Sequence, residues 1–74
     1  LIGDFTNAEK YLRRAVELMP DDPIVNDHYG DVLWQLNRKL QAKYFWLHVL
    51  ELDDAEDEMK RSIEIKLIDG PKKI

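Results

Sequence analysis

The chain has 74 residues, a net charge of −4 and no cysteine. This length allows one small domain, and the lack of cysteine excludes disulfides and thiolate metal sites. The negative charge disfavours nucleic acid as a partner, and no apolar run approaches the roughly 20 residues of a membrane-spanning helix. A hydrophobic content of 45% with 35% charged residues predicts a folded chain. The composition fits the cytoplasm and the periplasm alike, with the cytoplasm slightly favoured.

The first predicted helix runs from about Thr6 to Met19. Thr6 and Glu9 have the spacing of a capping box, in which a side-chain oxygen accepts from a free amide and the glutamate reciprocates. Apolar side chains recur at helical spacing along this segment and form one stripe, and Pro20 ends the helix. The stripe contains Ala8, Tyr11, Leu12, Ala15, Val16 and Leu18.

A second helix is expected after Asp22, which is a suitable N-cap and is followed by Pro23 in the first turn. It ends near Asn37, a residue that tolerates the left-handed conformation needed to turn the chain. Gly30 lies in the middle of this helix, where glycine costs about 1 kcal/mol relative to alanine. We therefore expect a neighbouring helix to approach closely at Gly30.

The third helix is expected over residues 39–52 and carries three consecutive aromatic residues. Neighbouring residues on a helix are 100° apart, so three of them fan across about 200° and cannot all face one core. We expect Trp46 in the core, Phe45 against the last helix and Tyr44 exposed. The last helix is expected to begin at residue 53 or 54 and to end at Asp69, with Gly70 as its C-cap.

The first and third predicted helices match each other at a period of 34 residues. The matched positions are Ala8 with Ala42, Leu12 with Trp46, and Ala15 with Val49. This period is typical of tetratricopeptide repeat (TPR) proteins, in which each unit is two antiparallel helices that cannot bury their apolar face alone.

Residues 3–70 resemble the TPR pattern in detail. Tyr29, Gly30, Ala42 and Trp46 occupy the large and small positions of one unit in order. The chain departs from the pattern at three positions, where alanine, proline and tryptophan are usual: Val49, Asp54 and Asn26. Residues 22–31 are also similar to a variant found in bacterial TPR proteins.

This resemblance implies an all-α, TPR-like stack of about four antiparallel helices that ends in a capping helix. Residues 1–22 would be the second helix of a truncated repeat, residues 23–53 a complete helical hairpin, residues 54–70 the capping helix and residues 71–74 a frayed tail. Because the chain opens inside a motif, we expect it to be the C-terminal fragment of a longer array.

TPR proteins bind peptides or partner domains in a concave groove lined mostly by the first helix of each unit. The resemblance places that groove at Ile24, Asp27, Asp31, Trp34 and Gln35. The two aspartates imply a neutral or basic protein or peptide, and they argue against the carboxylate recognition of chaperone-binding TPR domains. The expected function is a non-catalytic protein–protein interaction scaffold.

Catalytic or metal chemistry has little support in the sequence. His28 and His48 show no metal-ligand spacing. Asp27 and Asp31 lie one turn apart and could act as a general acid and base or as half a metal site, but no nucleophile, glycine-rich loop or third ligand joins them. We expect no catalytic residue, no cofactor and no metal site.

Self-association through the ends of the array is the alternative role. The first helix lacks the helix that covers it in a complete repeat, so Leu12 is expected on one exposed end. Ile65 and Ile68 lie off the main apolar stripe of the last helix and form a second surface. Contact through either end would give a weak homo-oligomer. Otherwise residues 1–2 fold over the first stripe, and the two isoleucines are scattered surface residues.

Overall fold

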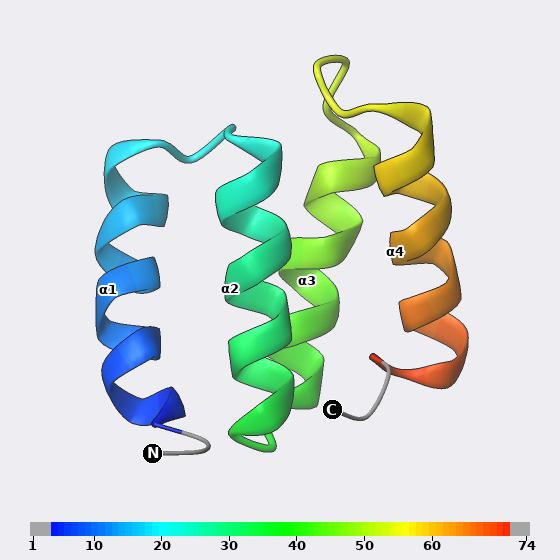
Figure 1. Ribbon diagram of the computed structural model, residues 1–74. Helices are drawn as coiled ribbons and strands as arrows, with labels where there is room; N and C mark the ends of the chain where they lie inside the picture. The colour runs from blue at the N-terminus through cyan, green and yellow to red at the C-terminus, as the bar shows by residue number, and fades with distance from the viewer. Residues whose placement is uncertain (1–3, 72–74) are drawn as a thin grey trace.

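The computed structural model describes residues 4–71, which form a stack of four antiparallel α-helices (Figure 1). The helices are α1 (Phe5–Leu18), α2 (Pro23–Gln35), α3 (Lys39–Leu50) and α4 (Asp57–Asp69). This confirms the predicted all-α stack. None of these helices is both long and apolar enough to cross a membrane. Residues 1–2, the suggested cover of the first stripe, lie outside the described part of the chain.

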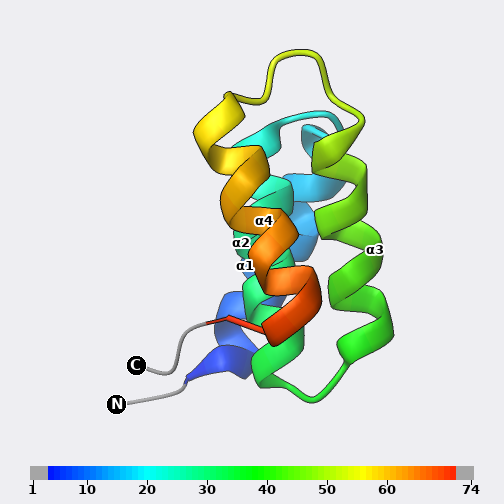
Figure 2. The same cartoon turned by 90° about the vertical axis from the view of Figure 1, so that its right-hand side faces the viewer.

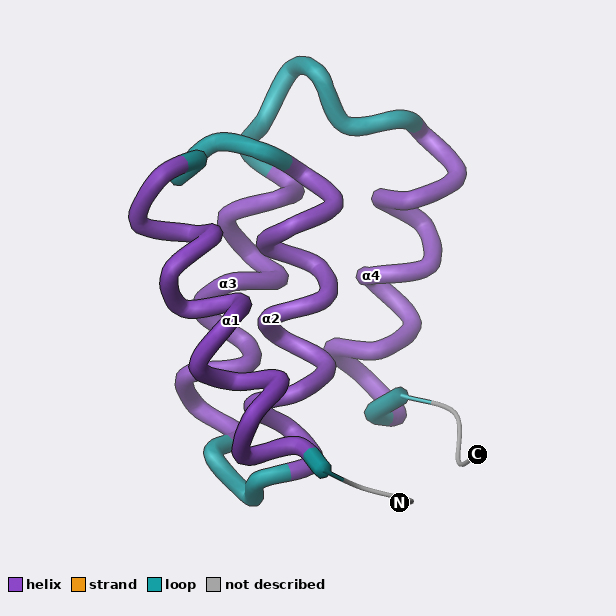
Figure 3. The backbone as a smooth tube through the Cα atoms, turned by 60° about the vertical axis from the view of Figure 1, so that its left-hand side comes forward, coloured by secondary structure: helices purple, strands orange, loops and turns teal. Residues whose placement is uncertain are grey.

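The hairpin of α2 and α3 forms the centre of the stack. These two helices share the largest interface, while α1 packs against α2, and α4 packs against α3. Figures 1 and 3 both place α2 between α1 and α4, so α4 lies on the side of α2 that α1 leaves open. The connection between α3 and α4, residues 51–56, rises above the ends of the other helices (Figure 2).

Local sequence signals correctly predict three helix ends. The Asp22 carboxylate caps α2 by accepting a hydrogen bond from the Val25 amide at 3.0 Å. Asn37 turns the chain after α2 with a φ of 63°, and Gly70 ends α4 with a φ of 78°. Both residues have the positive φ that glycine and asparagine tolerate best.

The predicted capping box at Thr6 is wrong. α1 begins at Phe5 with Asp4 as its N-cap, so Thr6 lies inside the helix. Glu9 is 7% exposed and accepts a hydrogen bond from the Tyr29 hydroxyl at 2.9 Å. Arg13 approaches the same carboxylate at 3.5 Å. Glu9 therefore binds Tyr29 of α2, although the local pattern assigned it to the N-terminal cap of α1.

Two further expectations need correction. The last helix begins at Asp57 instead of residue 53 or 54, because Ala55 is buried in the core and holds the preceding segment in turns. The ring of Phe45 packs against α2, where its centroid lies 4.7 Å from that of Tyr29, and not against the last helix as expected. Tyr44 is 67% exposed, as predicted.

The core is built around Trp46, which is completely buried. A Cβ added to Gly30 would lie less than 3.0 Å from three atoms of the Trp46 indole, so the glycine allows α2 and α3 to approach this closely. The indole N–H donates a hydrogen bond to the Asp27 carbonyl at 3.2 Å. Leu33, Ala42, Val49 and Ile63 belong to the same core, each at most 1% exposed.

Gly30→Ala is expected to destabilise the protein by about 1–3 kcal/mol, because the added methyl group pushes the indole away from the Asp27 carbonyl. Helix propensity alone predicts the opposite sign, a gain of about 1 kcal/mol. Urea unfolding followed by tryptophan fluorescence separates the two effects. Ser62→Ala on the exposed face of α4 is the control for propensity, and a stabilised Gly30→Ala variant would contradict the packing argument.

Tyr29→Phe is expected to cost about 1.5–3 kcal/mol at pH 8, because it leaves the buried Glu9 carboxylate without its donor. Burial and the hydrogen bond to Glu9 raise the pKa of Tyr29 from 10.0 to about 12. The unfolded chain therefore loses this proton first, and the wild-type protein loses stability as the pH rises from 10 towards 12. Urea titrations at pH 8 and 11 should show the difference shrinking, and a difference that stays constant between the two pH values would contradict this argument.

Candidate partner-binding cleft

Two aspartates of the predicted groove are occupied by a lysine of the same chain. Lys66 on α4 donates hydrogen bonds from Nζ to Asp27 at 2.7 Å and to Asp31 at 2.8 Å. Its side chain is only 16% exposed, and its ammonium lies 5.5 Å from the centroid of the Trp46 ring. This arrangement, the Lys66 bridge, fastens α4 to α2. The two carboxylates are therefore already paired within the chain and are not free to bind a basic partner.

The Lys66 bridge shifts the pKa values of its members. Burial raises the pKa of Asp31, and the Lys66 ammonium opposes that shift without cancelling it. Burial also acts to lower the pKa of Lys66, but the hydrogen bonds to Asp27 and Asp31 outweigh burial and raise it above 10.5. Lys66 therefore keeps its charge at neutral pH.

Lys66 is a site residue that was not predicted, although its position in the sequence carries a signal. Lys66 follows Ile63 by three residues and precedes Gly70 by four, so it lies on the face of α4 that points into the molecule. A lysine on the inner face of a helix needs an anion nearby, because an unpaired charge is costly to bury. The two groove aspartates were the obvious candidates.

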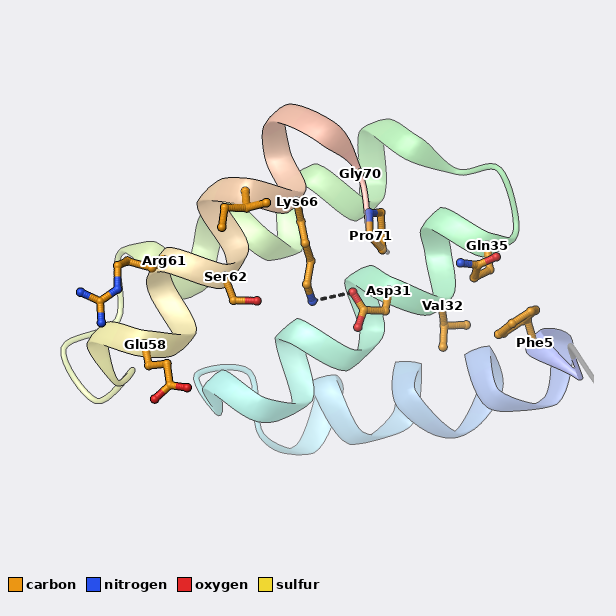
Figure 4. A pocket seen from close by; sticks show the side chains of 11 residues that line it. Phe5, Asp31, Val32, Gln35, Glu58, Arg61, Ser62, Lys66, Gly70 and Pro71 are labelled. Atoms are coloured by element: carbon orange, nitrogen blue, oxygen red, sulfur yellow. Dashed lines mark hydrogen bonds and ion pairs between the residues drawn. The ribbon is translucent and has the colours of Figure 1, made fainter. Parts of the chain in front are cut away.

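A cleft of about 630 Å³ lies between α2 and α4, and Lys66 and Asp31 of the bridge line it (Figure 4). Phe5, at the start of α1, and Gln35 lie at one end of it, while Glu58 and Arg61 lie at the other, and the contact between Lys66 and Asp31 crosses the middle. The remaining lining residues are Val32, Ser62, Ile65, Gly70 and Pro71.

The cleft is apolar at the end beside Phe5 and charged at the other, where Arg61 is the one base beside several acids. A second hollow shares Glu58 and Ser62 with the cleft and adds Asp27, Glu56 and Met59 to its lining. It therefore extends the cleft at the end where Glu56 and Glu58 are exposed. These two glutamates are free of the Lys66 bridge, which uses only the two aspartates.

Three of the five predicted groove residues line one of these two hollows, and the other two do not. Asp31 and Gln35 line the cleft, and Asp27 lines its acidic extension. Trp34 packs against Trp46, with ring centroids 5.5 Å apart, and is overlaid by Lys39 at 4.8 Å. Ile24 is 55% exposed and lines neither hollow.

The three residues expected to mediate self-association also lie in different environments. Leu12 is partly buried and packs against the core of its own chain. Ile65 is 60% exposed and lines the cleft, whereas Ile68 is 82% exposed and lies outside it. The apolar surface of α4 is thus part of the same site as the groove aspartates.

The histidines show no ligand-binding arrangement. His48 hydrogen-bonds Asp21 at 3.0 Å and lies 3.7 Å from Glu51, so it ties the end of α3 to the turn before α2. His28 is exposed. Among residues 4–71, no group of three histidine or acidic side chains is placed to hold a metal ion.

No protein-family model, curated protein or solved structure matches this chain. The TPR assignment therefore stays a prediction that rests on the residues themselves. The cleft, in contrast, is defined by the positions of its lining residues in the structure.

Lys66→Met is expected to destabilise the protein by about 1–3 kcal/mol, because two half-buried carboxylates lose their shared cation. The stability that Lys66 adds is fully present below pH 10.5 and is lost as the pH rises through its raised pKa, so the variant should lack this alkaline loss. Lys10→Met, on the exposed face of α1, is the matched control. Equal urea midpoints for both variants would show that the bridge adds nothing.

Proposed function

We propose that the chain is a non-catalytic interaction module of the TPR type, which binds an extended segment of a partner protein in the cleft between α2 and α4. One observation carries this proposal: the cleft is open, has a volume of about 630 Å³ and joins an apolar end to a charged end where Glu56, Glu58 and Asp27 outnumber Arg61. Its size falls within the usual range of ligand sites, about 300–1,000 Å³. No catalytic group is needed for this role.

The two ends of the cleft suggest what the partner segment carries. The apolar residues that line the cleft, Phe5 and Val32 on one wall and Ile65 on α4, suit one apolar side chain of the partner. The exposed glutamates at the other end, Glu56 and Glu58, suit a lysine or arginine. Asp27 and Asp31 already share Lys66. A basic side chain of the partner would therefore pair with the glutamates and not with these aspartates.

The spacing along α4 sets a distance between the two features of the partner. Glu58 and Ile65 are seven residues apart, which is about 10 Å along a helix axis. An extended peptide advances roughly 3.3 Å per residue. The partner's basic residue should therefore lie about three positions from its apolar residue.

Self-association through the ends, the alternative role, has less surface available. Leu12 packs against its own core and Ile65 lines the cleft, so Ile68 remains as the most exposed of the three residues. A single exposed isoleucine is common on monomeric proteins. The cleft is the better supported site.

Panning a randomised peptide library on phage against the immobilised protein tests the proposal. Enriched peptides should carry an apolar residue about three positions from a basic one. Ile65→Lys should lower the affinity of a selected peptide at least tenfold, whereas Ile68→Lys on the same helix should leave it unchanged. The second substitution makes the same chemical change outside the cleft.

The acidic end has its own matched pair of variants. Glu58→Lys should weaken the selected peptide about three- to tenfold and should reduce the salt dependence of binding, since it removes an attractive charge at the rim. Glu64→Lys changes the same charge on α4 away from the cleft and should have little effect. Equal affinity for all four variants, or no enriched pattern, would refute binding in the cleft.

A further inference from the structure

The outer face of α3 carries an exposed apolar stripe that neither the core nor the cleft uses. Leu40, Tyr44 and Leu47 are 85%, 67% and 52% exposed. Their spacing of four and three residues places them on one side of the helix, which binary patterning normally makes polar. Figure 2 shows α3 at the edge of the stack, with the other three helices all on one side of it. A contiguous apolar stripe of this kind marks an interaction surface.

The charges at the ends of α3 oppose its own dipole. The N-cap residue Arg38 and the first helical residue Lys39 are basic, and the C-cap residue Glu51 is acidic, with His48 beside it in the last turn. Glu51 is exposed and is followed by two more exposed acids, Asp53 and Asp54. A helix dipole favours acids at the N-terminus and bases at the C-terminus, so this arrangement destabilises an isolated α3. A second helix running in the opposite direction would offset it.

We infer that α3 pairs with α3 of a second copy of this chain, antiparallel, around a two-fold axis beside Tyr44. The stripe reads nearly the same in both directions, so Leu40 of one copy meets Leu47 of the other. These leucines are seven residues apart, about 10 Å along the axis. The basic N-terminal end of each helix then lies near the acidic C-terminal end of its mate, and the two dipoles oppose each other.

A second copy fits this surface better than a membrane does. A two-fold interface requires a surface that is complementary to itself, and both the stripe and the end charges of α3 meet this condition. An anionic lipid surface would attract the basic end but repel the acidic end. One helix pair buries less than the roughly 800 Å² per partner of a standard interface, so the dimer is weak and depends on concentration.

The pairing leaves the cleft free. No residue of α3 lines the cleft between α2 and α4, so a dimer would present two clefts at once. A partner with two copies of the recognised segment would then bind more tightly than a single segment does. The dimer itself does not depend on what the cleft binds.

Sedimentation equilibrium over a concentration series measures the pairing directly. The wild-type mass average should rise towards that of a dimer, and Leu47→Lys should raise the dissociation constant at least tenfold. Ile68→Lys makes a comparable change on α4, at a still more exposed position, and should associate like the wild type. A wild-type monomer at all concentrations up to about 1 mM, or an unchanged dimer in Leu47→Lys, would overturn the inference.

Cysteine cross-linking tests the direction of the pairing, and the chain has no native cysteine to interfere. An equimolar mixture of Leu40→Cys and Leu47→Cys should form a mixed disulfide dimer on mild oxidation. Each variant alone should form much less. Efficient cross-linking of Leu40→Cys to itself would instead indicate parallel helices and would overturn the antiparallel arrangement. Cross-linking in the mixture that persists in the presence of Tyr44→Lys would likewise overturn it.

Discussion

The hydrogen bonds from Lys66 to Asp27 and Asp31 are the interaction on which the cleft depends. α4 packs mainly against α3, through a buried Ile63, and the Lys66 bridge fixes its position relative to α2. Two carboxylates one helical turn apart repel each other when both are charged, and a shared ammonium removes that repulsion. The bridge thus sets the separation of the two walls between which a partner segment would lie.

The bridge in turn rests on the packing of the core. Gly30 leaves room for the Trp46 indole, and the indole donates to the carbonyl of Asp27. The same residue therefore joins the core through its backbone and α4 through its side chain. This continuity places the carboxylate rigidly, because a buried tryptophan fixes the backbone that carries it. A side chain on a free surface helix would lose more entropy when it binds a lysine.

The sequence predicts features that depend on a few neighbouring residues and fails where distant residues decide. The caps at Asp22, Asn37 and Gly70 follow from local chemistry, as does the all-α stack. The roles of Glu9 and Lys66 depend on partners 20 and 39 positions away, respectively. A local pattern assigned Glu9 to a helix end because nothing nearby revealed Tyr29. The groove aspartates were found on the correct helix, but whether they were free required knowing where α4 lies.

The occupied aspartates decide how a partner would be recognised. A basic side chain that displaced Lys66 would replace one hydrogen-bonded cation by another, so the exchange would gain little free energy and would release α4 from α2. A partner that leaves the bridge intact can use the apolar wall at Ile65 and the exposed charge at Glu58 without such a cost. Binding of the second kind adds contacts to a cleft that is already formed, and preorganisation of this sort favours affinity. The lysine that pairs with the groove aspartates is therefore what makes the cleft a defined site.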